Sequence, residues 1–484
     1  MKASEDKPMQ IFYSVFLSVI VGMYSSFIFG CAPRISSKGW EALNKGDLKG
    51  AREVVGEGVK NHSNSKELRD LMLRIDLLSR DWKSAVKSYK AFKRLAYKKE
   101  VVAARRLMVA QTIWWGLKEE DVSVRRESAK LAQELGVGGL GEALKRAVED
   151  EDILVRTYAY GAMLPENFDG WLGLMKLSHC DDPLIRKAAA QGMVKVVDRA
   201  YVFDVLLRLS RDEDPEVRAA AVGALSRVSL KNKKLFKSML DVLQGALKDP
   251  AGPVRGEAAY RLARIKARIG FEWSAEMLQD PELTVRLAAF RAMKGKYKNI
   301  EALQKVAGGD KMYVAFRAEV ALAKRGKLKN CGLALKKGMS AKNWAVRAAA
   351  VNAASSMPDC VGARDVVKKG MEDPHVKVKI SAARAALSIN WSKERALQVL
   401  KKISRGRGED GARAAEVLAL KKNKLGVERL RELVSSGTPV AKIRALEVLG
   451  RLGEGRSSVL DGWAGGPWSV RLAAAKVMWG WWGK

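Results

Sequence analysis

Cysteine and histidine are scarce in this sequence of 484 residues. The few that occur are Cys31, Cys180, Cys331, Cys360, His62, His179 and His375. So few cysteines exclude a disulfide framework as the basis of the fold. No second Cys/His cluster accompanies His179-Cys180 at zinc spacing, and neither a nucleophile elbow nor a metalloprotease helix occurs. We therefore expect no metal site, no cofactor and no catalytic activity.

Acidic residues are few relative to basic ones. Aspartate and glutamate total 54 against 88 lysines and arginines, which gives a formal net charge of +34. Such an excess favours polyanionic partners, namely nucleic acid, anionic lipid headgroups, lipopolysaccharide or an acidic wall polymer. The alternative is a well-solvated surface in an organism whose proteins are generally basic.

A long uncharged apolar run occurs at the N-terminus, where residues 11–30 directly precede Cys31. The sequence IFGC at 28–31 resembles the lipobox of bacterial lipoprotein signals, although Phe29 stands where a small residue is usual. The resemblance implies acylation of Cys31 by a fatty acid such as palmitate. It also implies attachment to a membrane of the cell envelope, which in a Gram-negative bacterium would be the outer membrane, facing the periplasm.

The same run is also compatible with an uncleaved anchor in the inner membrane. Twenty residues at about 1.5 Å each can cross a bilayer core of about 30 Å. Basic residues that follow the run, such as Arg34 and Lys38, favour a cytoplasmic body by the positive-inside rule. In either role residues 1–31 are a targeting or anchoring segment and residues 32–37 a tether, so neither informs the fold.

Residues 38–118 are predicted to be helical, and their first part resembles tetratricopeptide repeats. Asp47 and Asp81 lie 34 residues apart, which is the length of that repeat, and an alanine follows each after four residues. Gly39 also fits the family pattern, whereas Leu73 replaces the second glycine and no proline closes either repeat. The alternative is a generic helical hairpin that caps the region that follows.

The segment DEDPEVRAAAVGALSRV at 212–228 predicts an amphipathic helix. Its apolar residues recur three and four positions apart, Asp214 is placed to cap the helix, and Pro215 suits the first helical position. After a turn, LFKSMLDVLQGAL at 235–247 repeats an apolar stripe. Each unit is therefore expected to consist of an A helix, a turn and a B helix.

The A-helix pattern, an apolar residue followed by a basic one and then small residues, recurs twelve times at an average spacing of about 31 residues. It resembles the short HEAT repeats, the type also found in phycobilisome lyases. The resemblance implies an all-α solenoid of about twelve helix pairs over residues 119–484, in which stacked pairs share a continuous core. The basic positions are Arg125, Arg156, Arg186, Arg218, Arg255, Arg286, Arg317, Arg347, Lys379, Arg413, Arg444 and Arg471.

The repeated basic residue could serve as a ladder of ligand-binding side chains. We favour a structural role, in which its stem packs along the next repeat and its charge pairs with the acidic turn between repeats. Cys331 and Cys360 likewise occupy nearly equivalent places in successive repeats. Neighbouring helices pack about 8–10 Å apart, whereas a disulfide needs Cα atoms closer than about 7 Å, so a bridge is allowed but not expected.

Turns within repeats are rich in lysine, whereas turns between repeats are acidic, as at Asp212-Glu213-Asp214. Because equivalent turns of a solenoid line up along one edge, we expect a basic ridge that binds an extended polyanion in a salt-dependent way. The alternative is that these side chains only solvate exposed turns. The predicted ridge consists of Lys231, Lys233, Lys234, Lys294, Lys296, Lys298, Lys324, Arg325, Lys327, Lys329, Lys421, Lys422 and Lys424.

Tryptophan is concentrated at the C-terminus, where five of the thirteen lie within residues 463–482. We expect them to form a hydrophobic cap that closes the open end of the solenoid. The alternative is a docking patch or an interfacial membrane contact, since tryptophan favours the headgroup region.

These features favour a membrane-anchored envelope scaffold or adaptor without catalysis, whose solenoid surface binds a protein partner or an envelope polyanion. One alternative is a nucleic-acid-binding HEAT-repeat protein, because certain DNA glycosylases of similar fold cradle a duplex along a basic face. Another is a lyase or chaperone that acts on a partner protein, as the phycobilisome lyases do. Both classes lack a membrane segment, so residues 11–31 argue against them.

Overall fold

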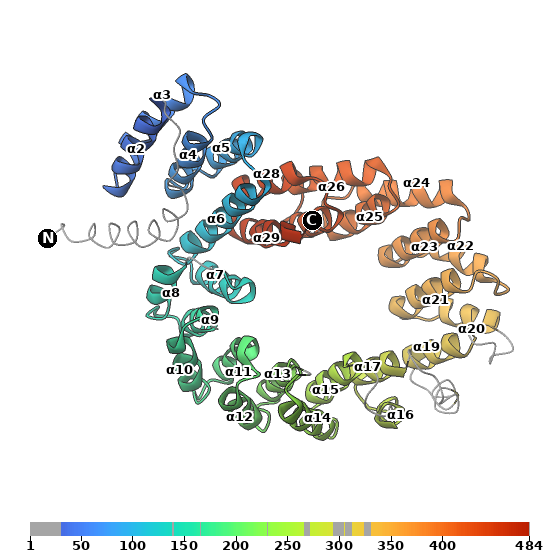
Figure 1. The fold of residues 1–484 in the computed structure, drawn as a ribbon. Coiled ribbons are helices and arrows are strands. Elements are labelled where there is room, and N and C mark those ends of the chain that lie inside the picture. The colour runs from blue at the N-terminus through green and yellow to red at the C-terminus, as the bar shows by residue number, and fades with distance from the viewer. Residues whose placement is uncertain are drawn as a thin grey trace. The chain divides into compact units, whose positions relative to one another are not determined.

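The computed structural model describes residues 31–483 except 138–139, 165, 230, 266–271, 294–303, 305–311 and 324–330. Regular structure in this part of the chain is helical throughout and contains no strand, which confirms the predicted all-α class (Figure 1). The chain forms two units, one made of residues up to 162 together with 430–484, the other of residues 163–429. This division differs in kind from the boundary expected between residues 118 and 119. That boundary separates two types of repeat, whereas the two units are separated by the contacts within each of them.

Unit 1, the unit made from both ends of the chain, begins with helices in antiparallel pairs. Its helices are α2 (Cys31–Asn44), α3 (Leu48–Asn61), α4 (Lys66–Leu78), α5 (Trp82–Leu95), α6 (Lys98–Gly116), α7 (Val122–Leu135), α8 (Gly141–Ala147), α9 (Ile153–Met163), α27 (Pro439–Leu452), α28 (Arg456–Gly465), α29 (Trp468–Trp479) and the 3-10 helix η2 (Gly480–Gly483). Residues 32–37, expected as a tether, are instead part of α2. Pro33 is tolerated there because it lies in the first turn, and Ile35 packs against α3 close to Gly58.

The two predicted tetratricopeptide-like repeats form helix pairs with the same local geometry. Asp47 and Asp81 cap α3 and α5, and their carboxylates accept hydrogen bonds from the backbone N–H groups three residues on, at 2.8 and 3.0 Å. A Cβ atom at Gly39 would lie 2.5 Å from Val55 Cγ2 and 2.9 Å from Leu71 Cδ2. Gly39 therefore lets α2 approach α3 and α4 closely.

The C-terminal tryptophans join the end of the chain to its beginning within unit 1. Helix α28 packs against α5, and α29 packs against α6 and α7. Trp463 is fully buried and its Nε1–H donates a hydrogen bond of 2.8 Å to Thr112 Oγ1. The ring of Trp82 meets the rings of Trp463 and Trp468 edge-on, at 5.1 and 6.3 Å between centroids. The tryptophans thus pack on helices of the N-terminal region. They were expected instead to cap an open end of the solenoid.

Unit 2 continues the repeats. Figure 1 shows α11, α13 and α15 side by side in one layer, with α12 and α14 in a second layer. All twelve predicted basic positions fall in A helices, from α7 to α29. The helices of unit 2 are α10 (Phe168–Leu177), α11 (Pro183–Gly192), the 3-10 helix η1 (Met193–Val196), α12 (Ala200–Leu209), α13 (Pro215–Leu225), α14 (Lys233–Ala246), α15 (Gly252–Arg264), α16 (Glu272–Met277), α17 (Leu283–Met293), α19 (Met312–Ala323), α20 (Cys331–Met339), α21 (Trp344–Ser356), α22 (Ala363–Glu372), α23 (Val376–Ser388), α24 (Lys393–Ser404) and α25 (Glu409–Leu420), while α26 (Lys424–Ser436) spans the division between the units.

Arginines of the A helices link successive repeats. Arg218 Nη1 donates to the carbonyl oxygens of Asp212 and Glu213 in its own turn, at 2.8 and 2.9 Å. Its Nε and Nη2 donate to both carboxylate oxygens of Asp249 in the next turn, each at 2.8 Å. The predicted pairing of the repeated basic residue with the acidic turn is confirmed at Arg218 and at four more positions, because the same arrangement joins Arg125 to Asp150, Arg186 to Asp212, Arg255 to Asp280 and Arg347 to Asp373. Arg413 and Arg471 differ, since they bond to Glu409 and to the carbonyl oxygen of Trp463.

Each of these aspartates also shapes its own turn. Asp249 Oδ1 accepts a hydrogen bond of 2.8 Å from the backbone N–H of Ala251. Burial alone would raise the pKa of the Asp249 carboxyl, but hydrogen bonds from Arg218 and from Ala251 outweigh it and hold that pKa below its usual range. The acidic turns are thus largely neutralised by arginines.

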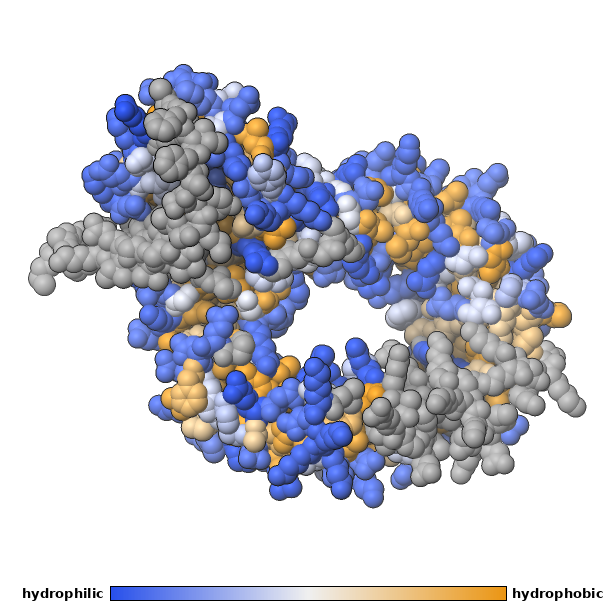
Figure 2. All heavy atoms as spheres, in the orientation of Figure 1, coloured by the Kyte–Doolittle hydropathy of each residue, from blue (hydrophilic) through white to orange (hydrophobic). Residues whose placement is uncertain are grey.

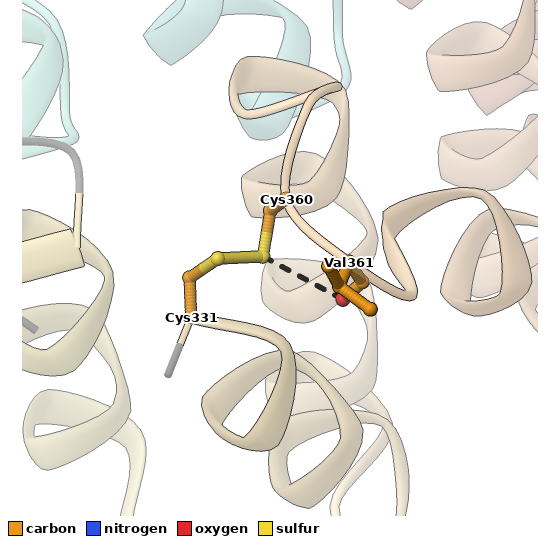
Figure 3. Close-up of a disulfide and its surroundings, with 3 residues drawn as sticks. All are labelled: Cys331, Cys360 and Val361. Carbon is orange, nitrogen blue, oxygen red and sulfur yellow. Dashed lines mark hydrogen bonds between the residues drawn. A yellow bond between two sulfur atoms is a disulfide. The ribbon is translucent and has the colours of Figure 1, made fainter. Parts of the chain in front are cut away.

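A disulfide joins Cys331, the first residue of α20, to Cys360 in the turn before α22 (Figure 3). The Cα atoms lie 6.1 Å apart, and Cys360 Sγ is 3.7 Å from the carbonyl oxygen of Val361. The sequence allowed this bridge but did not favour it, and that preference is wrong. The preference was based on the spacing of helix axes, whereas these residues lie at a helix end and in a turn, which approach one another more closely.

Candidate protein-docking surface

The predicted basic ridge is only partly within the described residues. Its described members are exposed. Lys231 lies in the turn after α13 and Lys233-Lys234 open α14, while Lys421 and Lys422 lie in the turn after α25 and Lys424 opens α26. The equivalent turn at 357–362 contains Asp359 and no basic residue, and the turn at 389–392 contains none either. Polyanion binding along this edge stays a prediction. Lys294, Lys296, Lys298, Lys324, Arg325, Lys327 and Lys329 lie outside the described residues.

The predicted acylation site, Cys31, is the first residue of α2, and the apolar run at 11–30 lies outside the described residues. Within the part of the chain that the structure describes, no helix combines the length and hydropathy needed to span a bilayer. Acylation of Cys31 and membrane attachment both stay predictions.

Helix α10 presents apolar side chains on both of its faces. Asn167 caps the helix, and its side chain accepts a hydrogen bond of 2.8 Å from the backbone N–H of Asp169. One face buries Trp171 and Leu174 in the core of the repeat. The opposite face carries Phe168, Leu172 and Met175, which are spaced four and three residues apart. They are 62%, 42% and 38% exposed. An exposed apolar helix face of this kind is a candidate binding surface.

The neighbouring helix α12 extends this apolar face. Tyr201 is 45% exposed, and its ring packs on the ring of Trp171 with 4.8 Å between centroids. Arg208 Nη2 donates to the carbonyl oxygen and to the hydroxyl of Ser178, at 3.1 and 2.6 Å, and so ties α12 to the end of α10. We call Phe168, Leu172, Met175 and Tyr201 the α10–α12 surface; orange apolar atoms are exposed over α10 in Figure 2.

A polar hollow lies beside this surface, at the turn between α10 and α11. It is lined in part by His179, Cys180 and Arg186, and Cys180 is a free cysteine. Hydrogen bonds with Asp212 raise the pKa of Arg186, and burial lowers the pKa of Arg208. Both guanidinium groups are engaged in the contacts between repeats. Among the described residues no group of three His, Cys, Asp or Glu side chains is placed to hold a metal ion.

The sequence contained a signal for the α10–α12 surface that periodicity alone did not reveal. Residues 168–177 read FDGWLGLMKL, in which large apolar side chains occupy more positions than one buried stripe needs. Such a helix either lies fully inside a core or exposes part of its apolar surface. The structure decides between these because α10 is a B helix with one face uncovered.

Known proteins resemble this chain in its repeats. Residues 172–263 match HEAT repeats. The matched region contains part of α10 and all helices to α14, and most of α15. No curated protein matches the chain.

Several solved structures have a similar fold. The Escherichia coli protein YibA is 17% identical with a TM-score of 0.34, over 63% of this chain and 96% of its own. Yeast importin-β, Kap95p, is 12% identical with a TM-score of 0.42, over 87% and 67%. A homology model of the AP-3 complex is 13% identical with a TM-score of 0.39, over 78% and 80%. Similarity at this level carries no information about partners.

Proposed function

We propose that this protein is a non-catalytic scaffold or adaptor, attached to a membrane of the cell envelope by its N-terminal segment, which binds a protein partner through the α10–α12 surface. The observation that carries the proposal is the group of large apolar side chains exposed on two helices that are fixed to one another. HEAT-repeat solenoids commonly present such surfaces to other proteins.

The composition of the α10–α12 surface favours a protein as its occupant. Aromatic residues and methionine are enriched at the centres of protein interfaces. Fully burying a side chain such as Phe168 or Leu172 is worth about 1.5–3 kcal/mol. The Tyr201 ring is already packed on the buried ring of Trp171, so Tyr201 loses little side-chain freedom when a partner covers it.

The cysteines support an exported location for this scaffold. The bond between Cys331 and Cys360 requires oxidation, and disulfides persist in the periplasm and at cell surfaces but are rare in the cytosol. The lipobox-like sequence before Cys31 favours the same compartment. A nucleic-acid-binding protein or a soluble lyase would have no need of either feature.

The proposal is tested with the full-length chain purified from its own membranes. The double variant Phe168→Ser/Leu172→Ser removes the centre of the surface. Leu420→Ser/Leu425→Ser is a matched control, because these leucines are 57% and 39% exposed elsewhere on unit 2. We expect one envelope protein to co-purify with the wild type and the control, and its recovery with the surface variant to fall at least tenfold. Equal recovery with both variants, at unchanged helicity and thermal stability, would contradict the proposal.

A further inference from the structure

The helices that open unit 1 start at one common end. A Cβ atom built on Gly58, near the end of α3, would lie 2.6 Å from Ile35 Cγ2 in α2 and 3.1 Å from Leu68 Cδ1 in α4. Lys66, the first residue of α4, donates a hydrogen bond of 2.9 Å to Glu100 in the first turn of α6. The first turns of α2, α4 and α6 therefore lie together, and we call this region the α2–α4–α6 end.

The α2–α4–α6 end is strongly basic. Its acidic side chains are Glu57, Glu67 and Glu100, of which Glu100 is engaged with Lys66 and with the backbone N–H of Tyr97. No ion pair joins Lys93, Arg94, Lys98 or Lys99 to another described residue. The exposed basic residues there are Arg34, Lys60, Lys93, Arg94, Lys98 and Lys99.

The opposite end of the same helices has a mixed charge. Its turns at 45–47, 79–81 and 117–121 contain Asp47, Asp81, Glu119, Glu120 and Asp121 beside Lys45, Arg80 and Lys118. The excess of positive charge is thus confined to one end of the helix stack. General solubility would not require this asymmetry, since lysines that only solvate a surface have no reason to gather at one end.

An exposed aromatic side chain, Tyr97, also belongs to the basic end. Tyr97, in the turn between α5 and α6, is 71% exposed, and Arg94 and Lys98 flank it in the sequence. Lys66 Nζ lies 5.3 Å from the centroid of its ring. Tyrosine beside lysine and arginine is typical of surfaces that lie at the headgroup level of a bilayer, where the ring and the charges both find partners.

The N-terminal segment enters unit 1 at this same end. Helix α2 begins at Cys31, directly after the apolar run, and Ile35, one turn further on, belongs to the α2–α4–α6 end. A bilayer that holds either the run at 11–30 or an acyl chain on Cys31 would have no flexible spacer between its surface and unit 1, because α2 begins at Cys31. We propose that the α2–α4–α6 end docks on the anionic phospholipid headgroups of the membrane that holds the N-terminus.

This inference rests on the membrane attachment in the proposed function and adds to it an orientation and a lipid class. Each lysine or arginine close to an anionic bilayer contributes about a fivefold gain in partitioning. Removing three of them should weaken docking about a hundredfold. Because these charges are exposed, docking should also be lost near 1 M salt, where the screening length is about 3 Å.

The test uses the full-length chain in vesicles of phosphatidylcholine alone or with about one third phosphatidylglycerol. Hydrogen exchange is followed by mass spectrometry in residues 93–106. The variant Arg94→Gln/Lys98→Gln/Lys99→Gln removes three charges at the basic end. Lys45→Gln/Lys49→Gln/Lys83→Gln removes three exposed charges at or near the opposite end as the matched control.

We expect slower exchange of residues 93–106 only in the anionic vesicles, for the wild type and the control variant but not for the basic-end variant. Equal exchange in both vesicle types would overturn the inference even though the protein floats with the vesicles. Failure to float with either vesicle type would instead contradict the membrane attachment. Protection by single-stranded RNA but not by anionic vesicles would also overturn the inference, in favour of nucleic acid.

Discussion

Replacing Arg218 by alanine should loosen the contact between two successive repeats. Arg218 makes four hydrogen bonds of 2.8 or 2.9 Å, two to carbonyl oxygens of its own turn and two to the Asp249 carboxylate. The side chains of this pair are only 14% and 11% exposed. Alanine would leave the largely buried Asp249 carboxylate without its counter-ion. It would also leave the carbonyl oxygens of Asp212 and Glu213 without the hydrogen bonds that Arg218 donates.

The expected cost follows from the burial of this pair. Removing one partner of a buried ion pair typically destabilises a protein by about 3–5 kcal/mol. An exposed pair is worth about 0–1 kcal/mol. Lys187 and Glu216 form such a pair at 3.1 Å between α11 and α13, with side chains 32% and 56% exposed. Lys187→Ala is therefore the control, and we expect it to change stability by less than about 1 kcal/mol.

Hydrogen exchange measures this cost locally, which matters because repeat proteins open in segments. A loss of about 3 kcal/mol corresponds to more than a hundredfold faster exchange in α13 and α15. Arg218→Lys should fall between alanine and the wild type, since lysine keeps the charge but cannot pair with both carboxylate oxygens. An Arg218→Ala exchange rate within about fivefold of the wild type, equal to that of Lys187→Ala, would refute the reasoning.

Three further outcomes follow from the described contacts. The pKa values of Asp212 and Asp249 are lowered in the fold, so their stabilisation is complete above the unfolded-state pKa of about 3.9 and is lost progressively as the pH falls from there through the lower folded-state pKa. A urea midpoint that does not change between about pH 6 and about pH 3 would count against this. Thr112→Val should cost about 1–3 kcal/mol in urea unfolding by leaving a buried indole N–H without its acceptor, and Thr112→Ser should restore the wild-type value. Reduction of the bond between Cys331 and Cys360, 29 residues apart, should lower stability by about 3–4 kcal/mol on chain entropy, and an identical urea midpoint with and without dithiothreitol would argue against the bond.

The repeat architecture could be predicted because each repeat carries its own signal. The basic residue of the A helix recurs near every 31st position, and its structural role requires it there, as Arg218 illustrates. Caps are equally local, so Asp47 and Asp81 could be recognised from a few neighbouring residues. Features of this kind depend on contacts within one repeat or between adjacent repeats.

Contacts between distant segments could not be predicted in the same way. Trp463 bonds to Thr112, 351 residues away, and neither residue belongs to a pattern that points to the other. The bridge between Cys331 and Cys360 depends on the geometry of a helix end and a turn. The apolar face of α10 is exposed because no described segment of the chain packs on that side of the helix. Periodicity describes a helix face but does not show whether another segment lies on it.

The claim that this scaffold is held at a membrane by Cys31 has a direct test. Cells that express the full-length chain, or the Cys31→Ser variant, are grown with radioactive palmitate, and the purified chains are compared for label. The account predicts label on the wild type and none on the variant, with the wild type in the membrane fraction. An unlabelled wild-type chain would contradict the account of Cys31, and its recovery in the cytosolic fraction would move nucleic acid ahead of an envelope partner.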